Sequence, residues 1–366
     1  MRTLVHFGAG AVGRSLVGSL FSAAGWRVVF ADVDTRVIDA LNARGSYRVV
    51  VKDTLPPGAP GELVVERVSG LLSTDTEAVA EAVASADLLG SSVGGGVLPR
   101  LMPTVAEGLR RRRARGGGPL SFLLCENLHG AGALARGELR RLLGPEFPLA
   151  EVFGAVETSI GKMVPIMPAA VRERDPLEVW GEAYNRIVAD RAGVLGAPPD
   201  VPGVDWKDHF SAWVERKLYI HNFGHAAAAY RGHRRGHRFL WECMADPAVR
   251  EPVAEAMEAS AKALGIRHPG VFGPGDLEAH VEDLLRRFGN RALGDTVFRV
   301  GRDLPRKLAP GDRLLGTLSL IHETGGDVFP VWRVIRAALA FDATGEDGET
   351  FGPDRAFLEN WRSGDE

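Results

Sequence analysis

The sequence predicts an α/β protein in which an N-terminal, doubly wound parallel sheet is followed by a mostly α-helical C-terminal domain. Two observations support this expectation. Short apolar runs alternate with segments of helical periodicity from residue 3 to residue 127, as strands and crossover helices do in a parallel sheet. Beyond residue 210, apolar residues at helical spacing dominate the sequence.

The first elements form a strand–helix–strand–helix unit. Residues 3–7 (TLVHF) form a short apolar run, and residues 26–34 contain a second one, WRVVFADVD. The segments at 8–25 and 35–45 that follow them carry apolar residues at helical spacing. Connections this short indicate parallel strands joined by crossover helices.

Two further buried strands and an intervening helix are expected in the same domain. Residues 85–93 (SADLLGSSV) and 120–127 (LSFLLCEN) have the apolar character of buried strands. The helical pattern at 99–116 lies between them. Its basic end, RRRRARGGG, is interpreted as a solvated helix end rather than a nucleic-acid contact.

A proline- and glycine-rich stretch, GAPPDVPGV at 196–204, is the clearest linker-like segment. We therefore place the domains at 1–196 and 197–366. Three helical patterns follow the linker-like segment: 210–232, 236–264 and 275–288.

Composition excludes several functional classes. The 366 residues carry a net charge of −3, which gives no electrostatic reason to expect a nucleic-acid partner. No apolar run is long enough to span a membrane, and no secretion signal is expected at the N-terminus. Cys125 and Cys243 are far apart and form neither a disulfide framework nor a zinc spacing. We expect a cytoplasmic protein without a metal; its oligomeric state stays open.

A glycine motif follows the first strand. Gly8, Gly10 and Gly13 have the GxGxxG spacing, and Asp32 ends the second strand. Gly8 would permit the tight turn, Gly10 would let the backbone approach a pyrophosphate, and Gly13 would allow helix and strand to pack closely. Asp32 would accept hydrogen bonds from ribose hydroxyls and repel a 2′-phosphate, which favours NAD over NADP. The alternative is a purely structural glycine turn.

Lysine is rare in this arginine-rich chain. Because a guanidinium stays charged, arginine cannot replace lysine where an amine must lose its proton. The few lysines therefore include candidates for proton transfer. They are Lys52, Lys162, Lys207, Lys217, Lys262 and Lys307.

One of them belongs to a helical stretch that holds two further polar residues, VERKLYIHNFGHAAAAY at 214–230. On a regular α-helix, Lys217, Asn222 and His225 share one side. A partly buried lysine can act as a general base, an amide can stabilise an oxyanion, and a histidine can orient a hydroxyl. No YxxxK motif or Cys/His cluster offers another proton donor or a zinc site. The alternative is an ordinary solvated helix face.

Asn127 follows the apolar run SFLLC. It lies at the carboxyl end of a predicted sheet strand, where doubly wound folds bind ligands. A second amide there could complete an oxyanion site with Asn222. The alternative is an amide that caps the turn at the strand end.

At these residues the chain resembles the polyol-specific long-chain dehydrogenase family, and most of all its mannitol-1-phosphate 5-dehydrogenase branch. The matching stretches run from residue 6 to residue 313 and include HFGAGAVGR, FADVD, FSAWVERKLYIHNFGHAAAAY and RVGRDLPRKLAPGDRL. Within them, Lys217, Asn222 and His225 fill the family's Lys-x4-Asn-x2-His signature. The resemblance implies a Rossmann-type domain, a helical domain and a metal-independent mechanism. In that mechanism Lys217 is the general base, Asn127 and Asn222 stabilise the alkoxide, and His225 places the substrate.

The resemblance also implies an activity, the oxidation of mannitol 1-phosphate by NAD to fructose 6-phosphate. Arginine and lysine suit a phosphate group, and we assign Arg302 and Lys307 to it; a solvated basic loop is the alternative. Gly161 and Lys162 stand where the family usually carries Asp and Arg, so substrate identity stays open. An uncharged polyol (mannitol or arabinitol), a hexuronate, and a non-catalytic NAD-binding sensor are the alternatives.

Overall fold

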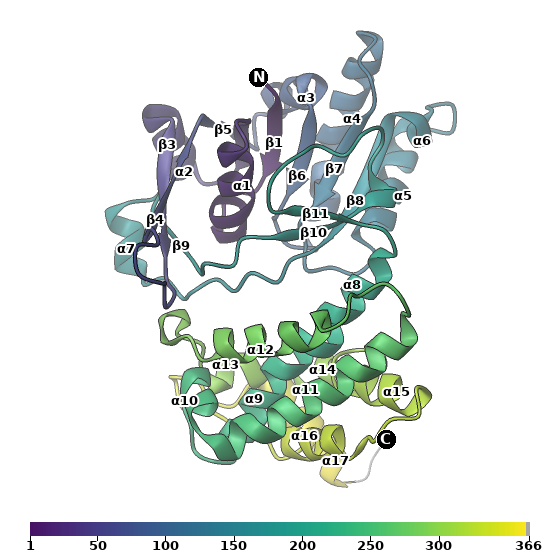
Figure 1. Ribbon diagram of the computed structural model, residues 1–366. Helices are drawn as coiled ribbons and strands as arrows, with labels where there is room; N and C mark the ends of the chain where they lie inside the picture. The colour runs from purple at the N-terminus through teal and green to yellow at the C-terminus, as the bar shows by residue number, and fades with distance from the viewer. Residues whose placement is uncertain (364–366) are drawn as a thin grey trace. The chain divides into compact units, whose positions relative to one another are not determined.

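The computed structural model describes residues 1–363. It divides into two compact units, with Met1–Phe210 forming the first and the second beginning at Ser211 (Figure 1). The first is built on a sheet and the second on helices, so the predicted fold class is confirmed.

The N-terminal unit contains an eight-stranded sheet in the order β11-β10-β8-β7-β6-β1-β2-β5. Strands β5, β2, β1, β6, β7 and β8 run parallel, whereas β10 is antiparallel to β8. The strands are β1 (Thr3–Phe7), β2 (Arg27–Asp32), β5 (Val68–Leu72), β6 (Leu88–Ser91), β7 (Leu120–Leu124), β8 (Phe153–Ser159), β10 (Ile187–Asp190) and β11 (Val204–Lys207). A second sheet contains β4 (Glu62–Glu66), β3 (Ser46–Val51) and β9 (Val179–Gly181).

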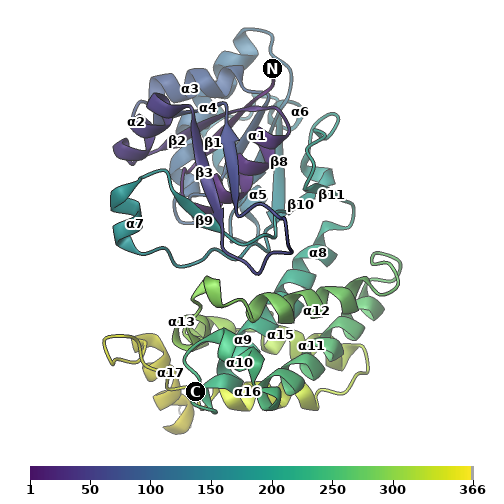
Figure 2. The ribbon, with the colours of Figure 1, turned by 60° about the vertical axis from the view of Figure 1, so that its left-hand side comes forward.

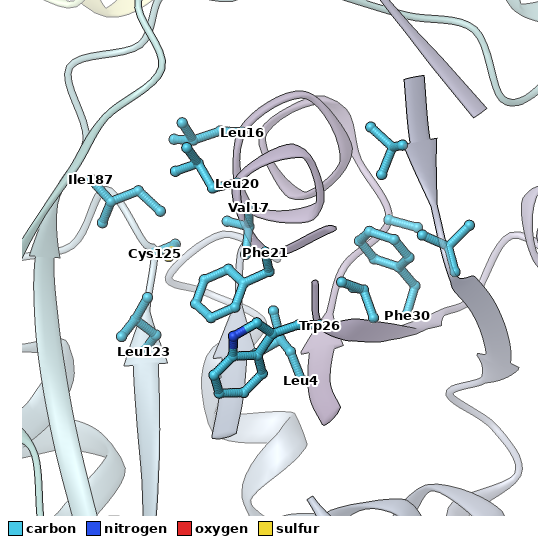
Figure 3. Packing of buried hydrophobic residues seen from close by; sticks show 14 of the residues in the cluster. Leu4, Leu16, Val17, Leu20, Phe21, Trp26, Phe30, Leu123, Cys125 and Ile187 are labelled. Carbon is cyan, nitrogen blue, oxygen red and sulfur yellow. The ribbon is translucent and has the colours of Figure 1, made fainter. Parts of the chain in front are cut away.

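Helices cover both faces of the large sheet, because its central strands are apolar on both sides. The helices of this unit are η1 (Gly13–Gly18), α1 (Ser19–Ala23), α2 (Thr35–Arg44), α3 (Thr76–Ser85), α4 (Leu98–Ala114), α5 (Ala131–Leu143), α6 (Leu149–Val152), α7 (Ala169–Arg174) and η2 (Arg191–Gly193). On one face η1, α1 and α2 share a core with the small sheet. In this core the rings of Phe21 and Trp26 pack edge to face, with their centroids 5.2 Å apart (Figure 3). The other face packs on α3, α4 and α5.

The domain boundary lies later than the sequence placed it. We expected the segment at 196–204 to link two domains, with the boundary at 196. Instead this segment connects β10 to β11, and Val204 pairs with Ile187 in the sheet. The hydrogen bonds of β11 therefore hold the chain in the first unit as far as Phe210. The proline and glycine content identified a loop correctly but not its place in the fold.

The second unit is a helical bundle (Figure 2). Its helices are α8 (Phe210–Arg216), η3 (Lys217–Asn222), α9 (Phe223–His233), α10 (Leu240–Ala245), α11 (Pro247–Arg267), α12 (Asp276–Phe288), η4 (Arg291–Leu293), α13 (Val297–Gly301), α14 (Leu304–Lys307), α15 (Leu315–Glu323), α16 (Phe329–Ala338) and α17 (Gly352–Ser363).

Helix α9 is the central element of this unit and contacts α10, α11, α13 and α16. Its residues are small where its neighbours approach: Ala226 to Ala229 are all buried. At Gly224 an added Cβ would lie 2.4 Å from Met257 Sδ, and at Gly232 it would lie 2.1 Å from Cys243 Sγ. Close packing around α9 therefore requires the absence of side chains at both glycines.

The expected helix at 236–264 is two helices in the structure. Helix α10 ends at Ala245, and α11 begins at Pro247. The Asp246 side chain accepts a hydrogen bond from the Ala248 N–H and caps α11. Proline has no N–H to continue the preceding helix but is well suited to the first helical position. The dipeptide Asp246–Pro247 thus marks the boundary between the two helices, which the continuous apolar periodicity did not indicate.

No helix within residues 1–363 combines the length and the apolar character needed to cross a lipid bilayer.

The packing around α9 can be tested with two glycine substitutions. In Gly232→Ala the new methyl group collides with buried Cys243. We expect the free energy of unfolding to fall by about 1–3 kcal/mol, as overpacking typically costs. In Gly265→Ala, inside α11, the nearest atom is Leu277 Cδ1 at 3.6 Å, so stability should be unchanged or higher. Urea unfolding of both variants measures the difference; equal stabilities would contradict the packing described.

Candidate functional site

The glycine turn after β1 has the geometry that its spacing predicts. Gly8 has φ +97°, and a Cβ there would lie 2.7 Å from the Ser92 carbonyl oxygen. A Cβ on Gly13 would lie 2.2 Å from the Gly8 oxygen, whereas nothing lies within 4 Å of the Cβ position at Gly10. Two glycines are thus required by the fold, and the third leaves an open approach to the backbone, as pyrophosphate binding needs.

Asp32 lies at the end of β2 and holds this turn. Its Oδ2 accepts the Ala9 N–H at 2.6 Å, and its Oδ1 accepts the Asp34 N–H at 3.0 Å. A carboxylate has about four acceptor positions, so capacity for ribose hydroxyls remains. Asp32 therefore has a structural role that its motif position did not reveal.

Arg14, in the turn after Gly13, is buried. It donates from Nε to the Ala9 carbonyl at 2.7 Å and from Nη1 to the Pro176 carbonyl at 2.8 Å. Arg14 thus ties the glycine turn to the chain around α7 through backbone oxygens.

Asn127 is exposed and lies beyond the end of β7, as predicted. Its neighbour Glu126 is buried and fixes the local backbone. The Glu126 carboxylate accepts the N–H groups of Val93 at 3.0 Å and Gly94 at 2.8 Å. The glycine-rich loop after β6 and the segment that carries Asn127 are therefore joined by one carboxylate, which sequence reasoning did not identify.

Lys217 and Asn222 lie at the two ends of a π-helical turn, not of a regular α-helix as expected. Within it the Phe223 N–H donates to the Leu218 carbonyl, an i→i+5 bond. Such a turn is wider than an α-helical one, so residues five apart are separated by about one full turn. Asn222 is therefore rotated less from Lys217 than on a regular α-helix, and the two residues stay on one side of the turn. Single π-helical turns of this kind are frequent at functional sites.

Lys217 is partly buried. Burial, and to a smaller extent the nearby Arg313 guanidinium, lower the pKa of its amine to about 8. Arg313 itself is held by Asp312, whose Oδ1 accepts from Nε at 2.8 Å. An amine with this pKa is substantially neutral at mildly alkaline pH and can accept a proton.

His225 lies three residues beyond Asn222, in the first turn of α9. Its ring stacks on Phe288 with centroids 5.0 Å apart, and its Nε2 lies 3.1 Å from Asp295 Oδ2. Burial, followed by several nearby cations of which Arg299 has the largest effect, lowers the pKa of His225 to about 3. The ring is therefore neutral near pH 7.

The contact with Asp295 defines which nitrogen of His225 carries the proton. Asp295 also accepts a hydrogen bond from Arg299 and is thus held as a carboxylate, which can only accept. The His225 Nε2–H must be the donor, which leaves Nδ1 with a lone pair. His225 can consequently accept a hydrogen bond from a hydroxyl group. Asp295 lies in a loop before α13, and no sequence spacing relates it to His225, so sequence reasoning could not identify it.

Arg302 and Lys307 lie at the two ends of one turn but face different surroundings. Lys307 is 4% exposed, and its Nζ donates to the carbonyl oxygens of Arg302 and, at 3.4 Å, Gly301. Burial lowers the pKa of Lys307 to about 7, with Arg313 as the next cause. Arg302 is exposed, and its guanidinium lies over the rings of Phe298 and Phe351.

Lys162 is a structural cation in the N-terminal unit. It is 8% exposed and donates to the carbonyl oxygens of Glu182 at 2.9 Å and Tyr184 at 3.0 Å, and to Asn185 Oδ1 at 3.2 Å. Its ammonium therefore holds the segment after β9.

Across residues 1–363, no three His, Cys, Asp or Glu side chains gather closely enough to hold a metal ion. The predicted site residues thus form two groups. The glycine turn, Asp32 and Asn127 belong to the N-terminal unit. Lys217, Asn222 and His225 are brought together in the helical unit, with Arg313 beside Lys217.

Structural comparison gives the same architecture in several solved proteins. The chain superposes on mannitol 2-dehydrogenase from Pseudomonas fluorescens, solved as a ternary complex with NAD and D-mannitol. The TM-score is 0.73 and the identity 19%, over 98% of this chain and 83% of that one. For a D-sorbitol dehydrogenase in substrate-free form, the TM-score is 0.78 and the sequence identity is 19%, over 95% of this chain and 82% of that one. At these identities the likeness establishes the fold.

Two domain families match nearly the whole chain. Residues 2–203 match the mannitol dehydrogenase Rossmann domain, and residues 209–362 match the mannitol dehydrogenase C-terminal domain. The junction between these matches agrees with the boundary at Phe210. The resemblance found at the Lys-x4-Asn-x2-His signature is thereby confirmed at the level of the family: the chain belongs to the mannitol dehydrogenase family.

Proposed function

We propose that this protein is an NAD-dependent dehydrogenase that oxidises a CH–OH group of a polyol, with Lys217 as the general base. The observation that carries the proposal is the partly buried amine of Lys217, whose pKa is lowered to about 8, in one turn with Asn222. Family membership supports oxidation of a polyol, and the mannitol 2-dehydrogenase of the same fold binds NAD and D-mannitol.

Each polar residue has its own role in the proposed proton transfer. Neutral Lys217 takes the proton of the reacting hydroxyl, and in ketone reduction its ammonium returns it. Asn222, one wide turn away, donates its amide N–H to the developing alkoxide, and Asn127 supplies a second amide. The His225 Nδ1 accepts a hydrogen bond from a neighbouring hydroxyl and orients the polyol.

The N-terminal unit provides the dinucleotide site. The open backbone at Gly10 receives the pyrophosphate, and Asp32 accepts hydrogen bonds from the adenosine ribose hydroxyls. A carboxylate at that position disfavours the 2′-phosphate of NADP. When bound, NAD supplies the nicotinamide carbon that accepts the hydride.

We infer that the substrate is mannitol 1-phosphate and the product fructose 6-phosphate. Three cations of the helical unit support a phosphate group: Arg302 is exposed, and Arg313 acts electrostatically on the buried Lys307. An uncharged polyol is the second candidate. Two observations favour it: Lys307 already donates to backbone carbonyls, and the structurally similar mannitol 2-dehydrogenase binds D-mannitol.

A substrate panel decides between these candidates. With NAD and purified protein, we expect kcat/KM for mannitol 1-phosphate to exceed that for mannitol, arabinitol and hexuronates by at least about 100-fold, since two charge-assisted hydrogen bonds contribute about 3 kcal/mol. NADH absorbance gives the rates. A higher kcat/KM for unphosphorylated mannitol would reject the phosphate, and no turnover with any compound would favour a sensor.

Replacing the base tests the mechanism. Lys217→Ala should reduce kcat by about 100-fold or more, because a positioned general base contributes 10²–10⁴. NAD binding, measured by calorimetry, should be unchanged. Lys262→Ala, on the exposed side of α11, is the matched control and should keep full activity. Wild-type kcat in Lys217→Ala would remove Lys217 from the mechanism.

The orientation of His225 can be tested through its partner. Asp295→Asn weakens a charge-assisted hydrogen bond contributing about 1.5–3 kcal/mol, so kcat/KM should fall roughly 10- to 100-fold. Asp342→Asn is the control, because the exposed Asp342 contacts His233 through the same kind of carboxylate–imidazole pair, at 2.7 Å. If both variants retain wild-type kcat/KM, Asp295 does not position His225.

A further inference from the structure

The turn from Gly301 to Lys307 has an unusual backbone. Asp303 between α13 and α14 has φ +74°, a left-handed conformation that a non-glycine residue rarely adopts. Such a conformation persists where surrounding contacts determine it, and it is enriched at ligand sites. This turn carries Arg302 and Lys307, the residues assigned to the phosphate.

On the inner side, the turn is anchored by the core of the bundle. The hydroxyl of buried Tyr230, on α9, donates to the Gly301 carbonyl at 2.9 Å. The Lys307 amine donates to the same carbonyl and to that of Arg302. A Cβ at Gly301 would collide with Phe341, so the backbone is tightly enclosed at this point.

On the other side, the turn is held by the C-terminal segment. Asp354 on α17 is 4% exposed, and its two oxygens accept the N–H groups of Asp303 at 3.0 Å and Leu304 at 2.6 Å. These are donors at the start of α14 that have no partner within the helix. A buried carboxylate with two backbone donors therefore stabilises the left-handed conformation of Asp303.

The same segment also supports a side chain. The guanidinium of Arg302 lies 5.6 Å from the ring centroid of Phe351 and 5.8 Å from that of Phe298. Planar stacking of this kind limits the orientations of an exposed arginine. Phe351 and Asp354 are only three residues apart, so one short stretch contacts both the backbone and the arginine of the turn.

We propose that the segment Phe351–Asp354 is a specificity element, in which Phe351 and Asp354 are positioning residues that preorganise Arg302 and Lys307 for the phosphate monoester of the substrate. The inference rests on the proposed function. Preorganisation strengthens binding because less side-chain and backbone freedom is lost when the ligand binds. The segment acts on the phosphate alone, and the reacting hydroxyl is left to Lys217.

The test compares two substrates in two variants. Asp354→Asn keeps the side-chain shape but offers one acceptor oxygen, and Phe351→Leu removes the aromatic face. We expect KM for mannitol 1-phosphate to rise about tenfold in each, with kcat nearly unchanged, and KM for mannitol to stay at the wild-type value. Glu349→Gln is the control, because the Glu349 side chain accepts a hydrogen bond from exposed Arg355 in the same region, at 2.9 Å.

A double-mutant cycle separates positioning from general support of the fold. If Phe351 acts through Arg302, then Phe351→Leu should have little further effect on KM for the phosphate once Arg302→Gln is present. Equal changes in KM for both substrates, a fall in kcat, or additive effects in the cycle would overturn the proposal. The wild-type protein tests the proposed function separately: a preference for mannitol over its phosphate would reject that function, and this inference with it.

Discussion

The removal of the Lys217 amine from water is the physical constraint on which the site depends. An exposed lysine holds its proton at neutral pH, and only desolvation and a neighbouring cation bring its pKa to about 8. The bundle creates that environment. Helix α9 is small enough at Gly224, Gly232 and the alanines between them to lie at its centre, so α9 and the turn preceding it are enclosed by other helices.

The π-helical turn and the Asp295 carboxylate determine how the polar groups near the Lys217 amine are arranged. The wide turn keeps Asn222 on the same side as Lys217, so an amide donor and the proposed base belong to one turn. Asp295 determines the tautomer of His225. The Nδ1 atom of His225 can therefore accept a hydrogen bond, and the neutral ring does not serve as a proton donor in place of Lys217. The chemistry we propose thus needs one titrating group and two polar groups of fixed polarity.

The sequence predicted the elements that repeat a local rule. The strand at Thr3–Phe7 follows from its apolar run, and the glycine turn and the acid at Asp32 follow from their spacing. The rarity of lysine made Lys217 a candidate. What it could not predict depends on contacts between distant residues. Asp295 and Asp354 reach their partners from 70 and about 50 residues away. The π-helical turn interrupts a periodicity that looks regular in the sequence, and β11 joins a sheet whose other strands lie earlier in the chain.

The dependence of the reaction on pH tests the central claim most directly, because it reports the ionisation of Lys217. The base must be neutral to oxidise an alcohol and protonated to reduce a ketone. We therefore predict that kcat/KM for alcohol oxidation rises with pH and levels off above an apparent pKa near 8. For ketone reduction, kcat/KM should fall over the same interval. Profiles that are flat from about pH 6 to pH 10 in both directions would contradict the account.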